Sequence, residues 1–153
     1  MRSSPKNHEP QPDQFVFLRG KTMRMQDAFI GSWRITDTEV WDRESIDLSG
    51  PAYIKFDRNG MGEFAFIAVR GSMDCRFSQR DGKPLAEFSW LGSDELDDAS
   101  GRGWAVVEDD GKLSGRVYFH LGEDSAFSAT RTSAAANLGG RKQRGPRSLS
   151  TLR

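Results

Sequence analysis

The amino-acid sequence predicts an all-β fold: an antiparallel meander of about eight strands that closes on itself, after a short N-terminal helical turn. Between positions 31 and 131, stretches in which apolar and polar residues alternate recur about every ten residues. Asn-Gly or Asp-Gly pairs separate several of them, and no pattern of helical period is long enough for a covering layer. Strands without covering helices bury their apolar face against one another, in a barrel or a sandwich.

The organised part of the chain begins with an apolar turn at 22–30, followed by alternation from Gly31 onward. Strict alternation places five residues on one face of this first strand, namely Trp33, Ile35, Asp37, Glu39 and Trp41. The later strand candidates are 51–57, 62–70, 72–79, 84–91, 103–108, 113–121 and 125–131. Tight turns are expected at 57–60, 80–83, 109–112 and 121–124, and longer connections at 42–50 and 92–102.

Composition divides the chain into three parts. Residues 1–24 are rich in proline and polar residues and are expected to form a disordered arm, unless the protein starts at Met23 or Met25. Residues 25–131 form the expected single domain, and 132–153 a disordered basic tail. Residues 28–131 carry a net charge of −7, which argues against nucleic-acid binding on the folded surface.

The expected cellular compartment depends on three features: the cysteine content, the longest apolar run and the first ten residues. Cys75 is the only cysteine, so no intrachain disulfide can form, and a reducing compartment is expected. No apolar run reaches the roughly 20 residues that a membrane span needs, and residues 1–10 lack the apolar core of a secretory signal. The expected location is the cytoplasm, without membrane association.

The motif Gly31-Ser32-Trp33, preceded by Asp27-Ala28-Phe29-Ile30, resembles the start of a calycin barrel, the group that contains lipocalins and fatty-acid-binding proteins. The resemblance implies a calycin-like barrel over about residues 25–131, in which Trp33 packs against an arginine from the last strand. Arg131 is the matching arginine. The stretches 41–42, 89–90, 94–95, 100–104 and 120–125 are also similar to a family of small uncharacterised bacterial proteins, which brings no activity with it.

The leading functional expectation is a non-enzymatic barrel that holds a small, partly apolar ligand, without a cofactor or metal. Asp37 or Glu39 would be its polar anchor if their face points inward; a bulge after Ile35 would leave both carboxylates exposed instead. The expected wall is aromatic, formed by Trp41, Phe56, Phe64, Phe66, Phe88, Trp90 and Phe119.

The alternative expectation is a protein-interaction module with a filled core, which acts through the acidic loops 42–50 and 92–102. Trp41, Leu48 and Leu96 are the candidate anchors there. The sequence predicts neither a partner nor an oligomeric state.

Chemistry-bearing motifs are few. An enzyme that uses Glu39 and His120 as acid and base would need the two within hydrogen-bond reach, and a Ser-His-Asp site at His120, Asp124 and Ser125 lacks a nucleophile elbow. The acidic stretch 94–98 does not have calcium-loop spacing and is expected to be a solvated loop with a helical turn capped by Ser93. Cys75 alternates with core residues and is expected to be one of them.

Overall fold

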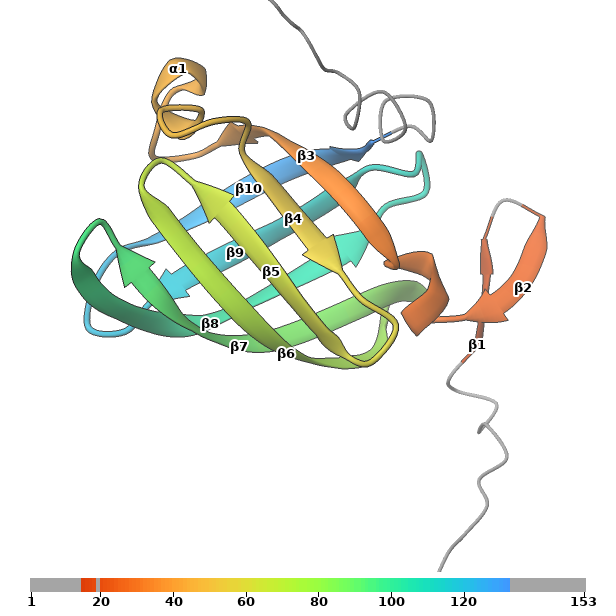
Figure 1. Ribbon diagram of the computed structural model, residues 1–153. Coiled ribbons are helices and arrows are strands. Elements are labelled where there is room, and N and C mark those ends of the chain that lie inside the picture. Colours follow the sequence, from red (N-terminus) through yellow and green to blue (C-terminus); the bar gives the residue numbers. More distant parts are fainter. Residues whose placement is uncertain (1–14, 19, 133–153) are drawn as a thin grey trace, which may run out of the picture.

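The predicted all-β fold is confirmed. The computed structural model describes residues 15–18 and 20–132, and its main body is a closed antiparallel barrel of eight strands (Figure 1). The barrel strands are β3 (Gly31–Thr38), β4 (Tyr53–Phe56), β5 (Met61–Phe66), β6 (Val69–Arg80), β7 (Lys83–Asp94), β8 (Asp97–Val107), β9 (Leu113–Phe119) and β10 (Asp124–Arg131). A 3₁₀ turn, η2 (Gln26–Ala28), precedes the barrel, and a short helix, α1 (Arg43–Ile46), lies between β3 and β4.

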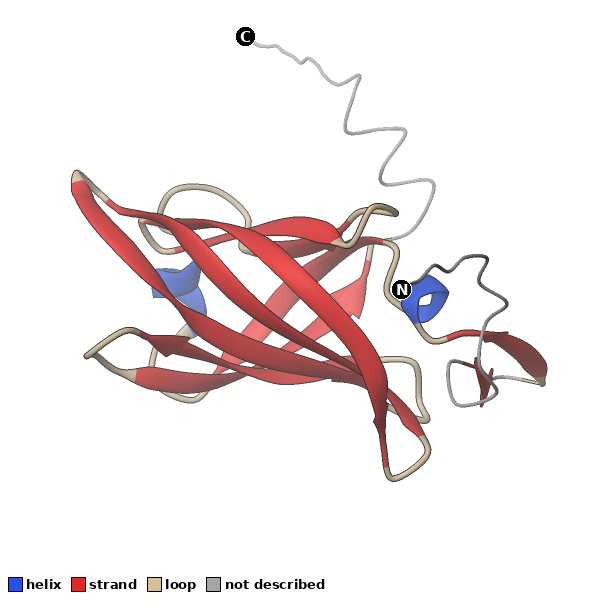
Figure 2. Ribbon diagram, turned by 90° about the horizontal axis from the view of Figure 1, so that it is seen from below, coloured by secondary structure: helices blue, strands red, loops and turns tan. Residues whose placement is uncertain are grey.

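Each barrel strand pairs with the next along the chain, and β10 pairs with β3 to close the sheet. Viewed from below, the two helical segments lie at opposite ends of the barrel (Figure 2). The connections of one end, which we call the α1 end, are 39–52, 67–68, 95–96 and 120–123. The opposite end, called the η2 end, holds residues 25–30 and the connections 57–60, 81–82 and 108–112.

Trp33 and Arg131 close the η2 end. The guanidinium carbon of Arg131 lies 4.2 Å from the centre of the Trp33 ring. Its two terminal nitrogens donate hydrogen bonds of 2.6 Å to the carbonyl oxygens of Ala28 and Ile30. The Trp33 indole N–H donates to the carbonyl of Phe29 at 2.9 Å. This is the contact that the calycin resemblance implies, and it ties the last strand to the turn before the first.

The predicted glycine turns are present. Gly60, Gly82 and Gly111 all have positive φ at hairpin connections, as tight turns require. Two further turns were not predicted, at 67–68 and at 95–96. The stretch 62–70 is not one strand, because Ile67 and Ala68 make a two-residue turn between β5 and β6.

The prediction of a long acidic loop at 92–102 that contains a helical turn is also wrong. The β7–β8 ladder continues to the pair Asp94–Asp97, so only Glu95 and Leu96 form the turn. Ile67 and Glu95 both have positive φ. Their backbone N–H groups donate to the carbonyls of Ile46 and Ala68, which belong to other connections of the chain.

Residues 15–24, expected to belong to a disordered arm, form a two-stranded hairpin beside η2, from β1 (Phe15–Leu18) and β2 (Lys21–Arg24). Its Leu18 and Met23 side chains pack against the barrel core, which explains why this apolar patch is ordered. The rest of the expected arm and residues 133–153 of the expected tail lie outside the described residues. Within the described part of the chain, no helix is long and apolar enough to cross a membrane.

Candidate functional site at the α1 end

Asp37 and Glu39 do not line the barrel interior. The register between β10 and β3 shifts at Ser128 and Ala129, so Thr36 is an extra, bulged residue of β3. The bulge reverses the alternation after Ile35. The Asp37 side chain is 63% exposed and the Glu39 side chain 57% exposed. The prediction of a buried polar anchor is therefore wrong, and the bulged alternative describes this strand.

Both carboxylates instead form ion pairs on the outside of the barrel. Asp37 pairs with Arg43 at 3.4 Å, and Glu39 with Arg116 at 3.3 Å. Arg116 also pairs with Asp124 at the start of β10. The Asp37–Arg43 pair links β3 to α1, and Arg116 on β9 links the β3–α1 connection to β10.

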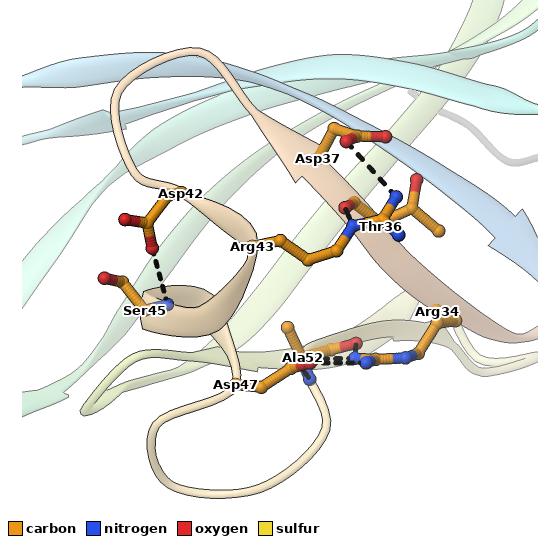
Figure 3. A network of polar contacts seen from close by, with 8 residues as sticks. All are labelled: Arg34, Thr36, Asp37, Asp42, Arg43, Ser45, Asp47 and Ala52. Carbon is orange, nitrogen blue, oxygen red and sulfur yellow. Dashed lines mark hydrogen bonds and ion pairs between the residues drawn. The ribbon is translucent and has the colours of Figure 1, made fainter.

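The connection 42–50 is held in one conformation by polar contacts around α1 (Figure 3). Asp42 caps the helix by accepting the backbone N–H of Ser45 at 2.8 Å. Arg43 donates from Nε to the carbonyl of the bulged Thr36 at 3.1 Å. Ile46 is fully buried beneath the helix, and its carbonyl accepts the N–H of Ile67. The bulge and the helix thus support each other.

Arg34 and Asp47 anchor the far side of the same connection. The two side chains form a bidentate ion pair with distances of 2.7 and 2.6 Å. Asp47 also accepts the N–H of Ala52 at 2.9 Å, and Arg34 donates to the Ala52 carbonyl. The hydrogen bond from Arg34, followed by that from Ala52, lowers the pKa of the Asp47 carboxyl to about 2. The loop is therefore tied to the barrel wall throughout the neutral range.

The barrel interior is filled by the aromatic residues expected to line it. Phe56, Phe64, Phe66, Phe88 and Trp90 are all buried, and Trp41 and Phe119 are half-buried. At the α1 end the Trp41 ring lies 5.5 Å from that of Phe66 and 6.3 Å from that of Phe119.

The space left beside Trp41 is a cavity of about 20 Å³, bordered by residues such as Ile35, Ile54 and Phe127. That volume corresponds to about one water molecule. As the molecule stands in this conformation, the interior does not accommodate a ligand of drug-like size.

His120 and Ser125 are two residues of the α1 end that the sequence offers as candidates for catalysis. His120 is exposed in the β9–β10 connection, and in the described part of the chain no hydrogen bond or ion pair joins its ring to a carboxylate. Ser125 is buried and donates to the carbonyl of Ala126. Among residues 15–18 and 20–132, no group of three or more His, Cys, Asp or Glu side chains could hold a metal ion.

Exposed aliphatic side chains gather at the α1 end. Leu96 is fully exposed, Leu121 is 95% exposed, Leu48 70% and Val40 47%. They come from three connections: Val40 and Leu48 lie in 39–52, Leu96 in 95–96 and Leu121 in 120–123. The sequence pointed to Leu48 and Leu96; Val40 and Leu121 were missed, although Leu121 lies next to Gly122 in a turn that the sequence did predict. Trp41, the third expected anchor, packs inward instead.

Exposed acidic residues lie in the same connections and at the adjoining strand ends. They are Asp42, Glu44, Asp94, Glu95, Asp97, Asp98, Glu123 and Asp124, all of them exposed. Three nearby arginines, Arg34, Arg43 and Arg116, are engaged in the ion pairs described above. The α1 end is therefore an acidic surface from which four aliphatic side chains project.

No family model, no curated protein and no solved structure matches this chain. The closed eight-stranded barrel is compatible with a calycin-like fold, and that compatibility rests on the architecture alone.

Proposed function

We propose that this protein is a protein-interaction module of calycin-like architecture, and that the α1 end of its filled barrel is the docking surface. The observation that carries the proposal is the set of four exposed aliphatic side chains at that end: Val40, Leu48, Leu96 and Leu121. Full burial of one leucine side chain contributes about 1.5–3 kcal/mol. Four such side chains in contact with a partner could supply the apolar centre of an interface.

Rigid supports make these side chains suitable anchors. Leu96 projects from a two-residue turn at the end of strands that pair along their full length. Leu48 follows α1, which Asp42 caps and the Arg34–Asp47 pair fixes to the barrel. A surface that is already ordered loses less conformational entropy on binding.

The charge of the same end indicates the kind of partner. Seven of the eight exposed carboxylates near these aliphatic side chains form no ion pair within the described residues, the exception being Asp124. They favour a partner with a basic surface, since opposite charges steer encounter and exclude acidic competitors. We therefore propose a basic protein segment or face that carries apolar pockets for the leucines.

The experiment compares two matched triple variants. Leu48→Ser/Leu96→Ser/Leu121→Ser removes three exposed aliphatic residues from the α1 end. Phe17→Ser/Met61→Ser/Leu91→Ser removes three exposed apolar residues that lie on strands β1, β5 and β7, outside the connections of the α1 end. A partner isolated with the unaltered protein is purified, and its Kd is measured with each variant.

We expect the α1-end variant to bind at least about 100-fold more weakly, which corresponds to about 1 kcal/mol per leucine, and the control to bind within about threefold. Equal binding by both variants would show that the docking surface lies elsewhere.

A small apolar ligand inside the barrel is the second candidate function. It is supported by the aromatic lining and by the half-buried Trp41 ring beside the interior cavity. Such a ligand would have to displace Trp41, so its binding should change tryptophan fluorescence. A fluorescence titration with fatty acids and aromatic alcohols tests this; an unchanged spectrum across the panel would exclude these ligand classes.

The proposal places the module in the cytoplasm of a bacterium. The single free cysteine supports a reducing compartment, and the similarity to small bacterial proteins supports the source. Fractionation of cells that produce the tagged protein would locate it, and recovery outside the cytoplasmic fraction would contradict the placement.

A further inference from the structure

A groove of about 400 Å³ lies at the η2 end, opposite the proposed docking surface. It runs between the residues that lead into η2, the β4–β5 connection and strand β6. The lining residues are Arg24, Met25, Gln26, Arg58, Asn59, Gly60, Cys75, Arg76 and Phe77. Its volume falls within the range of pockets that bind small molecules.

The charge of this groove is opposite to that of the domain. Three of its nine lining residues, Arg24, Arg58 and Arg76, are cationic, and none is acidic. No described carboxylate forms an ion pair with these arginines, whereas Arg34, Arg43 and Arg116 are all paired. Arg76 lies opposite Glu87 in the β6–β7 ladder and lines a second surface hollow with Glu87 and Asp74. Arg24 and Arg58 are therefore the two rim cations whose donors are most available to an anion.

The floor of the groove is apolar. Met25 and Cys75 are buried, and Phe77 is half-buried with its ring 5.5 Å from that of Phe29 in the core. A ligand that fills the groove therefore meets apolar surface below and guanidinium groups at the rim. An inorganic ion would use only the rim.

Hydrogen bonds hold the walls together. The Gln26 side chain donates to the carbonyl of Arg58 at 2.7 Å, which links η2 to the β4–β5 connection. The N–H of Cys75 donates to the carbonyl of Gly60 at 2.8 Å, which links that connection to β6. The arginines are thus mounted on elements fixed to one another, as a preformed site requires.

Burial, followed by the charges of Asp74 and Asp57, raises the pKa of the Cys75 thiol to about 12. The thiol is therefore protonated at neutral pH and does not act as a nucleophile. The groove has the features of a binding site rather than of a covalent one.

We propose that this groove binds a phosphate monoester with a short apolar body. A phosphate monoester carries nearly two negative charges at neutral pH, and guanidinium groups bind phosphate oxygens in bidentate fashion. Three arginines suit that charge better than they suit a single carboxylate, and the apolar floor receives the organic part. This site goes beyond the proposed interaction function and does not depend on it.

Isothermal titration calorimetry of the full-length protein with phenyl phosphate tests the site. We expect a sub-millimolar Kd, with inorganic phosphate and benzyl alcohol each at least about tenfold weaker, because each lacks one half of the recognition. Arg24→Gln/Arg58→Gln should weaken phenyl phosphate binding at least about tenfold. The control Arg70→Gln/Arg102→Gln removes two exposed arginines outside the groove and should change the Kd less than twofold.

A second measurement keeps the test independent of the variants. In the unaltered protein, phenyl phosphate should shift the backbone amide signals of Gly60 and Phe77 and leave that of Leu96 in place. The absence of binding at 10 mM, equal affinity for benzyl alcohol or inorganic phosphate, or equal weakening by the control variant would overturn the proposal.

Discussion

Arg131 lies over the indole ring of Trp33, 4.2 Å from its centre, and hydrogen-bonds the carbonyl oxygens of Ala28 and Ile30. One side chain therefore joins β10 to the turn that precedes β3, about a hundred residues earlier in the sequence. The carbonyls at the end of η2 have their donors, and the η2 end of the barrel is closed. The contact fixes the η2 end of the barrel, which lies opposite the proposed docking surface.

Arg131→Ala should lower the free energy of unfolding by about 2–3 kcal/mol, because it removes two charge-assisted hydrogen bonds and a cation–π contact. Arg131→Lys should recover only part of the loss, since an ammonium group lacks the planar guanidinium geometry that reaches both carbonyls over the ring. Urea unfolding measures all three proteins. A loss below about 0.5 kcal/mol for Arg131→Ala, comparable to that of an exposed control such as Arg102→Ala, would contradict this role.

Gly71→Ala should destabilise the barrel by about 2–4 kcal/mol. A β-carbon at Gly71 would lie 2.7–2.9 Å from ring atoms of Phe64 and Trp90, and neither buried ring has room to move. Thermal unfolding of Gly71→Ala and of the neighbouring outward-facing Ser72→Ala compares an interior with an exterior position on the same strand. If the two melting temperatures fall by the same amount, the tight packing of rings against Gly71 is not a feature of the folded protein.

The Arg34–Asp47 pair makes stability depend on acid pH. The folded-state pKa of Asp47 is lowered from 3.8 to about 2, so its contribution is complete above about pH 4 and is lost as the pH falls toward 2. Because the pair is partly exposed, Asp47→Asn should cost only about 1 kcal/mol at pH 7. Urea unfolding of both proteins at pH 7, 4 and 2.5 checks this. A difference that stays constant over that range would contradict the assignment.

Cys75 should be nearly inert while the protein is folded. With a pKa of about 12 in place of 9, its thiolate fraction at pH 8 is smaller by roughly a factor of 1,000. Alkylation by iodoacetamide, followed by mass spectrometry, should be slower by at least that factor in buffer than in denaturant. Similar rates in the two conditions would show that the thiol is exposed and ionisable, and that the floor of the η2-end groove is not closed.

The sequence predicted the barrel well where local chemistry decides the structure. The turns at Gly60, Gly82 and Gly111 require positive φ, and a glycine in the sequence indicates such a position. The turns at Ile67 and Glu95 also have positive φ, but their support comes from hydrogen bonds to Ile46 and Ala68 on other connections. Contacts between residues far apart in the chain leave no signal in the sequence around the turn itself.

The candidate site was harder to predict for a similar reason. Asp37 and Glu39 would face inward on a regular strand, and only the bulge at Thr36 turns them outward. The bulge is held by Arg43, which donates to the Thr36 carbonyl from the connection that follows. The aromatic residues did point inward as predicted. Alternation alone could not show that their combined volume would leave a cavity of only about 20 Å³.

Native mass spectrometry of the protein purified from its own host tests whether the α1 end docks a second protein. We expect a complex with a second, basic polypeptide. That complex should be absent from the Leu48→Ser/Leu96→Ser/Leu121→Ser variant and present with the Phe17→Ser/Met61→Ser/Leu91→Ser control. A protein that carries only a small-molecule mass increment, lost on denaturation, or a complex that survives loss of the three leucines, would contradict the claim that the α1 end is a docking surface.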